Sequence, residues 1–205
     1  MLIHPLAVRI THWVNAIAML IMVASGWRIY NAAPFFSFTI PPQLTLGGWL
    51  GGALQWHFAG LWLLVINGVI YLSYGLASRH IAANFFPLTL AAIWRDLRSA
   101  LRGRIAHEVG VYNALQRMAY LGVICAVIAL VFSGAALWKP VQLQELAALI
   151  GGYEGVRRVH FVAMALVVAF VIVHLVMVVL VPRTLISMFS GYGRKTQLSR
   201  DTHHG

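Results

Sequence analysis

Four long apolar runs dominate the pattern of hydrophobic and polar residues along the chain. They cover about Val8–Tyr30, His57–Ala77, Met118–Trp138 and Val159–Val181. A helix that crosses a bilayer needs roughly 20 mostly apolar residues, and each run has that length. Because backbone in lipid must satisfy its own hydrogen bonds, the runs predict an all-α, integral membrane four-helix bundle. We expect residues 1–205 to form a single domain with a cytoplasmic tail at residues 182–205.

Two segments between the runs have a character of their own. The segment Asn31–Trp56 is rich in proline, glycine and aromatic residues and has no lysine or arginine. It is expected either to lie against the membrane or a partner subunit, or to form a re-entrant or interfacial turn. The segment Ser78–Leu115 places apolar residues at helical spacing around Trp94, with arginines on another side. That pattern predicts an interfacial helix.

Composition and charge agree with a membrane protein. Hydrophobic residues make up 60% and charged residues 10% of the chain, too little charge for a water-facing surface. One side of the predicted bundle carries Arg9, Arg79, Arg95, Arg98, Arg102, Arg104, Arg117, Arg183, Arg194, Lys195 and Arg200; the other carries Arg28, Lys139, Arg157 and Arg158. This segregation predicts a multi-pass membrane protein with both termini cytoplasmic. We therefore expect the net charge of +10 to interact with anionic membrane lipid head groups and not with nucleic acid.

Four histidines lie within or at the edges of the apolar runs, where an ionisable residue indicates function. They are His12, His57, His160 and His174. If successive runs alternate in direction, His57 and His160 lie near the periplasmic side, and His12 and His174 lie nearer the cytoplasm. The 14 residues from His160 to His174 correspond to about 21 Å of helix and bring both rings to one face.

This arrangement predicts two pairs of axial heme ligands, His57 with His160 and His12 with His174. Two neutral imidazoles suit a heme iron, so we expect two hemes b with these four residues as the iron ligands. The single cysteine, Cys125, excludes a Cys-x-x-Cys-His motif and therefore a covalently attached c-type heme. The alternatives are helix–helix hydrogen bonding by histidine, a zinc site or a proton relay.

For other residues in or near the apolar runs, the sequence leaves two interpretations of their role. Gly26, Gly60, Gly68, Gly122 and Gly134 either admit a flat macrocycle or serve ordinary small-residue packing. Arg157 and Arg158, close to His160, are expected to bind propionates of the periplasmic heme, or else to anchor the fourth run at the interface.

The sequence resembles the diheme cytochrome b subunits of bacterial formate dehydrogenases and nickel–iron hydrogenases, the bacterial cytochrome b561-type family. The resemblance covers nearly the whole chain. It rests on RITHWVNA around His12, WHFAG at His57, VYNALQRMAY, SGAALWKP, RRVHFVAMALVVAFVIVHL with its histidine pair, and LISMFSGYGRK.

The resemblance implies electron transfer across the membrane between a periplasmic redox subunit and quinone. The partner would be a molybdopterin enzyme or a hydrogenase. The quinone site would lie beside the cytoplasmic heme at Asn113, and the neighbouring Gln116 offers a second amide donor. Capping of the third helix is the other reading of Asn113. The chain would thus be the electron-transfer subunit of an oxidoreductase complex; the alternatives are a stand-alone superoxide:quinone oxidoreductase and a heme-free membrane anchor or transporter subunit.

Overall fold

The computed structural model describes residues 5–77, 89–102 and 114–191. Its long helices are α1 (Leu6–Ala32), α2 (Leu50–Ala77), α5 (Ala114–Trp138) and α7 (Gly152–Leu180). The shorter ones are η1 (Pro42–Leu44), α4 (Leu90–Leu101), α6 (Gln144–Leu149) and α8 (Pro182–Ser190). These ranges contain no strand, and all four long helices are long and apolar enough to cross a membrane. The prediction of an all-α, multi-pass membrane bundle is confirmed.

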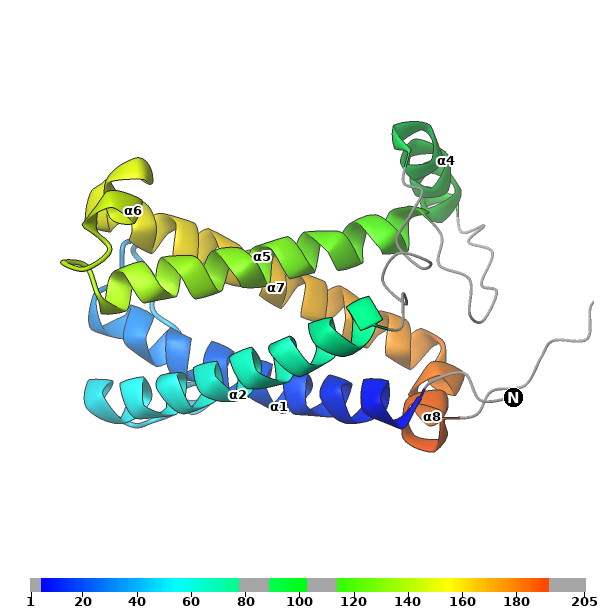
Figure 1. Cartoon of the computed structure of the whole chain (residues 1–205), viewed down its shortest axis with the longest axis horizontal. Coiled ribbons are helices and arrows are strands. Elements are labelled where there is room, and N and C mark those ends of the chain that lie inside the picture. The colour runs from blue at the N-terminus through cyan, green and yellow to red at the C-terminus, as the bar shows by residue number, and fades with distance from the viewer. Residues whose placement is uncertain (1–4, 78–88, 103–113, 192–205) are drawn as a thin grey trace, which may run out of the picture.

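The four long helices run lengthwise through the molecule and alternate in direction (Figure 1). α1 starts, and α2 and α7 end, at the end of the bundle where α4 and α8 lie. The opposite end carries α6. We call these two ends the α8 end and the α6 end. His12 and His174 therefore lie toward the α8 end, and His57 and His160 toward the α6 end.

The bundle consists of two helical hairpins. Close backbone packing joins α1 to α2 along their length and joins α5 to α7. Among the described residues, no comparably close packing joins a long helix of one hairpin to a long helix of the other. The backbones of the two hairpins therefore stand further apart than the helices within each hairpin.

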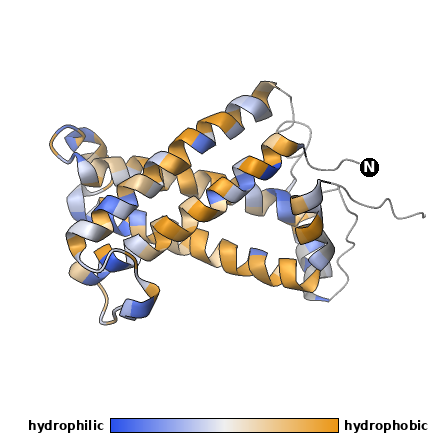
Figure 2. Cartoon of the chain, turned by 90° about the horizontal axis from the view of Figure 1, so that it is seen from below, coloured by the Kyte–Doolittle hydropathy of each residue, from blue (hydrophilic) through white to orange (hydrophobic). Residues whose placement is uncertain are grey.

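Large apolar side chains cover the outside of the bundle. Leu20, Trp62, Ile66, Leu166 and Val179 are each more than half exposed. Figure 2 shows hydrophobic colour along much of each long helix. The buried positions are mostly small, and they include Ala18, Ala53, Ala126 and Ala163. This inside-out distribution is typical of helices that face lipid and pack through small residues.

One buried amide links the helices of the first hairpin. The Nδ2 of Asn67 on α2 donates to the backbone carbonyl of Thr11 at 2.8 Å and to Oδ1 of Asn15 at 2.7 Å, both on α1. Asn67 is only 5% exposed. An amide at this depth has no water to bind, so satisfaction by the neighbouring helix also fixes the register of α2 against α1.

The second long helix begins earlier than the sequence predicted. The prediction placed a loop up to Trp56, whereas α2 starts at Leu50. The backbone N–H of Ala53 donates to the carbonyl of Trp49 at 2.9 Å and closes the first turn. Gly51 and Gly52 sit in that turn because a Cβ there would overlap the Trp49 ring or the Gly47 carbonyl. These glycines indicated a loop in the sequence, but they permit a tight helix start.

The segment after α7, which the sequence predicted to be part of a cytoplasmic tail, begins with a further helix. Residues 182–190 form α8, which packs on the start of α1. Nε of Arg9 donates to the carbonyl of Met188 at 3.1 Å, and the rings of Trp13 and Phe189 lie 4.5 Å apart. The interfacial helix predicted within the segment Ser78–Leu115 is present as α4, with Leu90 and Trp94 exposed.

The amide bridge generates a stability prediction. Replacing Asn67 by Ala removes both hydrogen bonds and should lower the free energy of unfolding by about 1 kcal/mol. Replacing Asn15 by Ala as well should reveal a coupling of about 0.6 kcal/mol between the two side chains, the typical value for interhelical pairs in membranes. Unfolding in detergent micelles by added sodium dodecyl sulfate, followed by circular dichroism, measures both.

Gly68→Ala is the matched control, because Gly68 lies next to Asn67 and a Cβ at this position meets no atom within 4 Å. This variant should have an unchanged or slightly higher free energy of unfolding. An Asn67→Ala variant no less stable than Gly68→Ala would contradict the bridge.

Candidate functional site

The structure brings the four intramembrane histidines together as two pairs. The ring centres of His57 on α2 and His160 on α7 lie 6.4 Å apart, with 62° between their planes. Those of His12 on α1 and His174 on α7 lie 6.1 Å apart, with 63° between the planes. Each pair joins one hairpin to the other, and α7 contributes one ring to each. These are the pairs that the depth argument predicted.

The separation of the rings fits a shared metal ion. A metal–imidazole bond of about 2 Å on each side, plus about 1 Å from each nitrogen to its ring centre, adds up to roughly 6 Å. All four rings are half-buried. Among the described residues, no group of three or more His, Cys, Asp or Glu side chains converges on a possible metal. Two imidazoles per site match the axial ligand set of a heme, whose macrocycle brings the remaining nitrogen ligands itself.

At the α6 end, both histidines are held by a serine of the partner helix within the same hairpin. Oγ of Ser25 on α1 lies 3.0 Å from Nδ1 of His57. Oγ of Ser133 on α5 lies 2.9 Å from Nδ1 of His160. Both serines are almost completely buried, at 0% and 1% exposure. In each hairpin, Nδ1 is thus engaged, and the other ring nitrogen is left for a ligand between the hairpins.

A glycine follows each of these serines and lies against the same imidazole. A Cβ at Gly26 would come within 3.5 Å of Cε1 of His57, and one at Gly134 within 3.2 Å of Cε1 of His160. Gly60 instead allows α1 and α2 to approach, because a Cβ there would meet Ile21 and Met22 at 3.0 and 3.1 Å. Gly68 and Gly122 face open space. The sequence did not distinguish these roles.

Aromatic side chains surround the pair at the α8 end. The ring of Phe170 stacks on His174 at 6.0 Å with 8° between the planes, and Tyr120 of α5 contacts Phe170 at 6.1 Å. The ring of Trp13 meets His12 edge-on at 5.4 Å. The two histidine pairs are therefore set in different surroundings.

Arg157 ties the segment after α1 to the start of α7. Its guanidinium donates to Oε1 of Glu154 at 2.9 Å and to the carbonyl of Ala33 at 2.6 Å. It also lies 4.6 Å from the ring centre of Phe35. Phe35 belongs to an aromatic cluster with Tyr30 and Phe161, the residue next to His160. The arginine predicted for a propionate thus anchors the segment that follows α1 to the start of α7.

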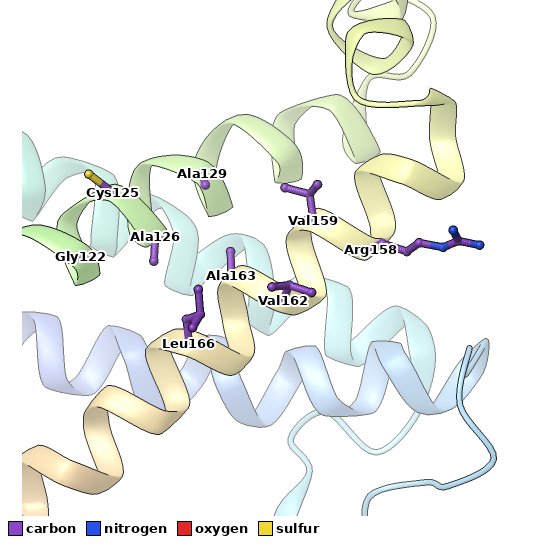
Figure 3. A pocket seen from close by; sticks show the side chains of 9 residues that line it. All are labelled: Gly122, Cys125, Ala126, Ala129, Arg158, Val159, Val162, Ala163 and Leu166. Atoms are coloured by element: carbon purple, nitrogen blue, oxygen red, sulfur yellow. The ribbon is translucent and has the colours of Figure 1, made fainter. Parts of the chain in front are cut away.

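Arg158 points to a different side of α7. It lies at one end of an apolar groove of about 460 Å³ between α5 and α7 (Figure 3). The groove is lined by Gly122, Cys125, Ala126, Ala129, Val159, Val162, Ala163 and Leu166 as well. None of the four paired histidines lines it, so it is separate from the site between the hairpins.

The quinone prediction concerns Asn113 and Gln116, which are close in sequence to the start of α5. Asn113 lies outside the described residues, and Gln116 lies in the first turn of the helix, which begins at Ala114. The backbone N–H of Ala114 donates to Oδ2 of Asp96 on α4 at 2.7 Å. A carboxylate from a separate helix therefore caps α5, a role that the sequence did not indicate.

The main residues missed in the sequence are Ser25 and Ser133. A signal was present, because the dipeptide Ser-Gly occurs near the same end of the first and third apolar runs. The role of this dipeptide could not be assigned without knowing which side chain of the neighbouring helix lies opposite the serine.

Comparison with known proteins gives consistent results. A family model described as prokaryotic cytochrome b561 matches residues 3–191. A protein of Azospira oryzae that carries the name protein-methionine-sulfoxide reductase subunit YedZ1 is 56% identical over 191 residues, covering 93% of this chain and 96% of that protein. A Ni/Fe-hydrogenase B-type cytochrome subunit of Cupriavidus necator is 24% identical over 190 residues, covering 84% and 76%. No solved structure matches significantly.

The contacts of Arg157 predict a local effect of its removal. In an Arg157→Ala variant, the segment between α1 and α2 loses its hydrogen bond at Ala33 and the contact of the guanidinium with Phe35. We expect cleavage of residues 33–49 by added chymotrypsin to become several-fold faster, since local opening of a loop governs proteolysis. Arg158→Ala is the matched control and should cleave at the wild-type rate. Equal rates in the two variants would show that Arg157 does not hold this segment.

Proposed function

Because the chain belongs to the prokaryotic cytochrome b561 family, we propose that it is the diheme electron-transfer subunit of a periplasmic oxidoreductase. In this proposal, His57 and His160 hold one heme b, and His12 and His174 hold the other. A bound heme b supplies reversible one-electron chemistry at its iron. The protein's own part is to position the two sites and to keep water away from them.

The observation that carries the proposal is the spacing of the two histidine pairs. Both ring-centre separations, 6.4 and 6.1 Å, suit one iron between two imidazoles. Direct hydrogen bonding between the two rings of a pair would bring them closer than this. The pairs lie on facing hairpins whose backbones stand apart, which supports room for a flat macrocycle between them.

The orientation in the membrane follows from charge. Arg9 and Arg117 lie toward the α8 end, the end to which the sequence assigns eleven of the fifteen basic residues. We place the α8 end and both termini in the cytoplasm and the α6 end in the periplasm, across a bacterial inner membrane. The pair His57–His160 then lies next to a periplasmic partner.

The class of partner comes from the relative of highest identity named above. That relative is a protein-methionine-sulfoxide reductase subunit, so we propose a periplasmic enzyme of this class as the partner. Reduction of a sulfoxide to a thioether consumes electrons and protons and releases water. Electrons would therefore enter at the α8 end from a membrane quinol and leave at the α6 end.

Arg157 is the better placed of the two arginines for a propionate. It lies about 60° around α7 from His160, whereas Arg158 lies about 160° away, nearly on the opposite face of the helix. The ion pair of Arg157 with Glu154 is an exposed one, because the Glu154 side chain is 60% exposed. Such a pair contributes little, so the guanidinium can exchange Glu154 for a propionate at small cost.

The quinol would bind near Asn113 and Gln116 at the start of α5, beside the His12–His174 pair. Their amides can donate hydrogen bonds to quinone carbonyls. Gln116 lies on the helix that brings Tyr120 against Phe170, which stacks on His174. This chain of contacts supports a short distance between the amides and the α8-end pair.

The pairing of the histidines can be tested by the number of hemes that remain. Wild-type protein should contain about two hemes b per chain in a pyridine hemochrome assay, and any single His→Ala change among the four should leave about one. The double variant His57→Ala/His160→Ala should also leave about one, because both changes affect the same site. The cross-pair variant His57→Ala/His12→Ala should leave none.

These double variants control for each other, since both remove two histidines. Equal heme contents in the two would reject the pairing. A wild-type chain without heme would reject the proposed function and favour a heme-free anchor.

The quinone site is tested by electron exchange with an added short-chain quinol. Asn113→Ala and Gln116→Ala should each slow heme reduction roughly fivefold, the effect of losing one hydrogen bond worth about 1 kcal/mol. Heme content and optical spectra should be unchanged. Gln144→Ala, an exposed amide at the α6 end, is the control and should keep the wild-type rate. Wild-type rates in both variants at the start of α5 would place the quinone elsewhere.

A further inference from the structure

We propose that Ser25 and Ser133 are positioning residues that set the tautomer, rotation and electron donation of His57 and His160. Through them the two hairpins keep the periplasmic heme at a lower reduction potential than the same pair of imidazoles would give without the hydroxyls. This inference rests on the proposed function, because it assumes that the two histidines are axial ligands.

The first step concerns the single proton of each hydroxyl. Oγ of Ser25 lies 2.6 Å from the carbonyl oxygen of Ile21, and Oγ of Ser133 lies 2.6 Å from that of Ala129. Two oxygens at this distance require a proton between them, and a carbonyl has none to give. Each hydroxyl therefore donates to its own helix and has only lone pairs left for the histidine.

The second step fixes the histidine tautomer. Since the serine oxygen accepts, Nδ1 of His57 and of His160 must carry the proton and donate. In a neutral imidazole the lone pair is then on Nε2, the nitrogen that would bind the iron.

The third step is the space beside each serine. Gly26 and Gly134 lie against Cε1 of the two rings, so the imidazole can approach the hydroxyl without meeting a Cβ. The fit is tighter at Gly134, where an added Cβ would lie 3.2 Å from the ring, than at Gly26, where it would lie 3.5 Å away. Serine and glycine thus act together as a cradle for one edge of the ring, and the same cradle occurs once in each hairpin.

The consequence is electronic. A hydrogen bond from Nδ1–H to an acceptor makes the imidazole a stronger donor to the metal. Stronger donation favours ferric over ferrous iron, so it lowers the reduction potential of that heme. Because each of the two histidines at the α6 end donates to a serine hydroxyl of its own hairpin, the two effects on the potential add at one site.

The test is a redox titration of the purified full-length chain, with electron paramagnetic resonance of its low-spin hemes. Ser25→Ala and Ser133→Ala should each raise the midpoint potential of one heme and leave the other unmoved. The double variant should raise the same heme further. The unmoved heme is an internal control in every sample. Thr11→Ala is the matched control, because Thr11 is a buried hydroxyl on α1 that donates to the Ala7 carbonyl in the same way. It should leave the potential of the periplasmic heme unchanged.

The glycines provide a second readout that does not depend on the hydroxyls. Gly134→Ala should turn the ring of His160 and shift the resonance of the periplasmic heme more than Gly26→Ala shifts it through His57. A reversed order would show that the rings are not held in these cradles.

Several outcomes would overturn the inference. Unchanged potentials in both serine variants, with wild-type heme content, would reject it while leaving the proposed function intact. If a Ser→Ala variant loses the periplasmic heme, Ser→Thr decides the cause: retention of the heme at the wild-type potential supports the hydroxyl, and loss of it points to packing alone. A wild-type chain without heme would defeat the proposed function and this inference together.

Discussion

The separation of the two imidazole pairs is the geometric constraint on which the rest of the structure depends. Rings whose centres lie 6.4 and 6.1 Å apart can share an iron, whereas hairpins in direct contact would bring them closer. The bundle meets this constraint by packing tightly within each hairpin and loosely between them. α7 contributes one histidine to each pair, so the rise along this helix sets the distance between the two sites across the membrane.

Because the two hairpins are not closely packed against each other, other contacts must hold the bundle together. Within the first hairpin, the buried amide of Asn67 binds α1 at two points. At the α6 end, Ala136, Ala147 and Val156 form a small core that joins α5, α6 and α7. At the α8 end, Arg9 and Trp13 hold α8 against α1. Each contact lies within a hairpin or at an end of the bundle.

The two ends of the bundle treat their histidines differently. At the α6 end, buried hydroxyls engage Nδ1 of both rings, and Arg157 binds the Ala33 carbonyl of the segment that follows α1. At the α8 end, His174 stacks on Phe170 and His12 contacts Trp13. Hydrogen bonding and aromatic contact affect a metal ligand by different means. Under the diheme proposal, the two hemes would therefore have unequal reduction potentials.

The sequence by itself determined the membrane class, the four spans, the depth of each histidine and, from the 14-residue spacing on one helix, how the histidines pair. These follow from local properties, because hydropathy and helical rise are set by consecutive residues. The tertiary structure alone decided that Ser25 meets His57, that Ser133 meets His160 and that Asn67 meets Asn15. It also decided that α2 begins at Leu50 and that residues 182–190 pack on α1 as a helix. The physical reason is that a hydrogen bond between two helices depends on the rotation and register of one helix against the other. Small-residue packing along the whole interface sets both, and this packing produces no periodic pattern in the sequence of either helix.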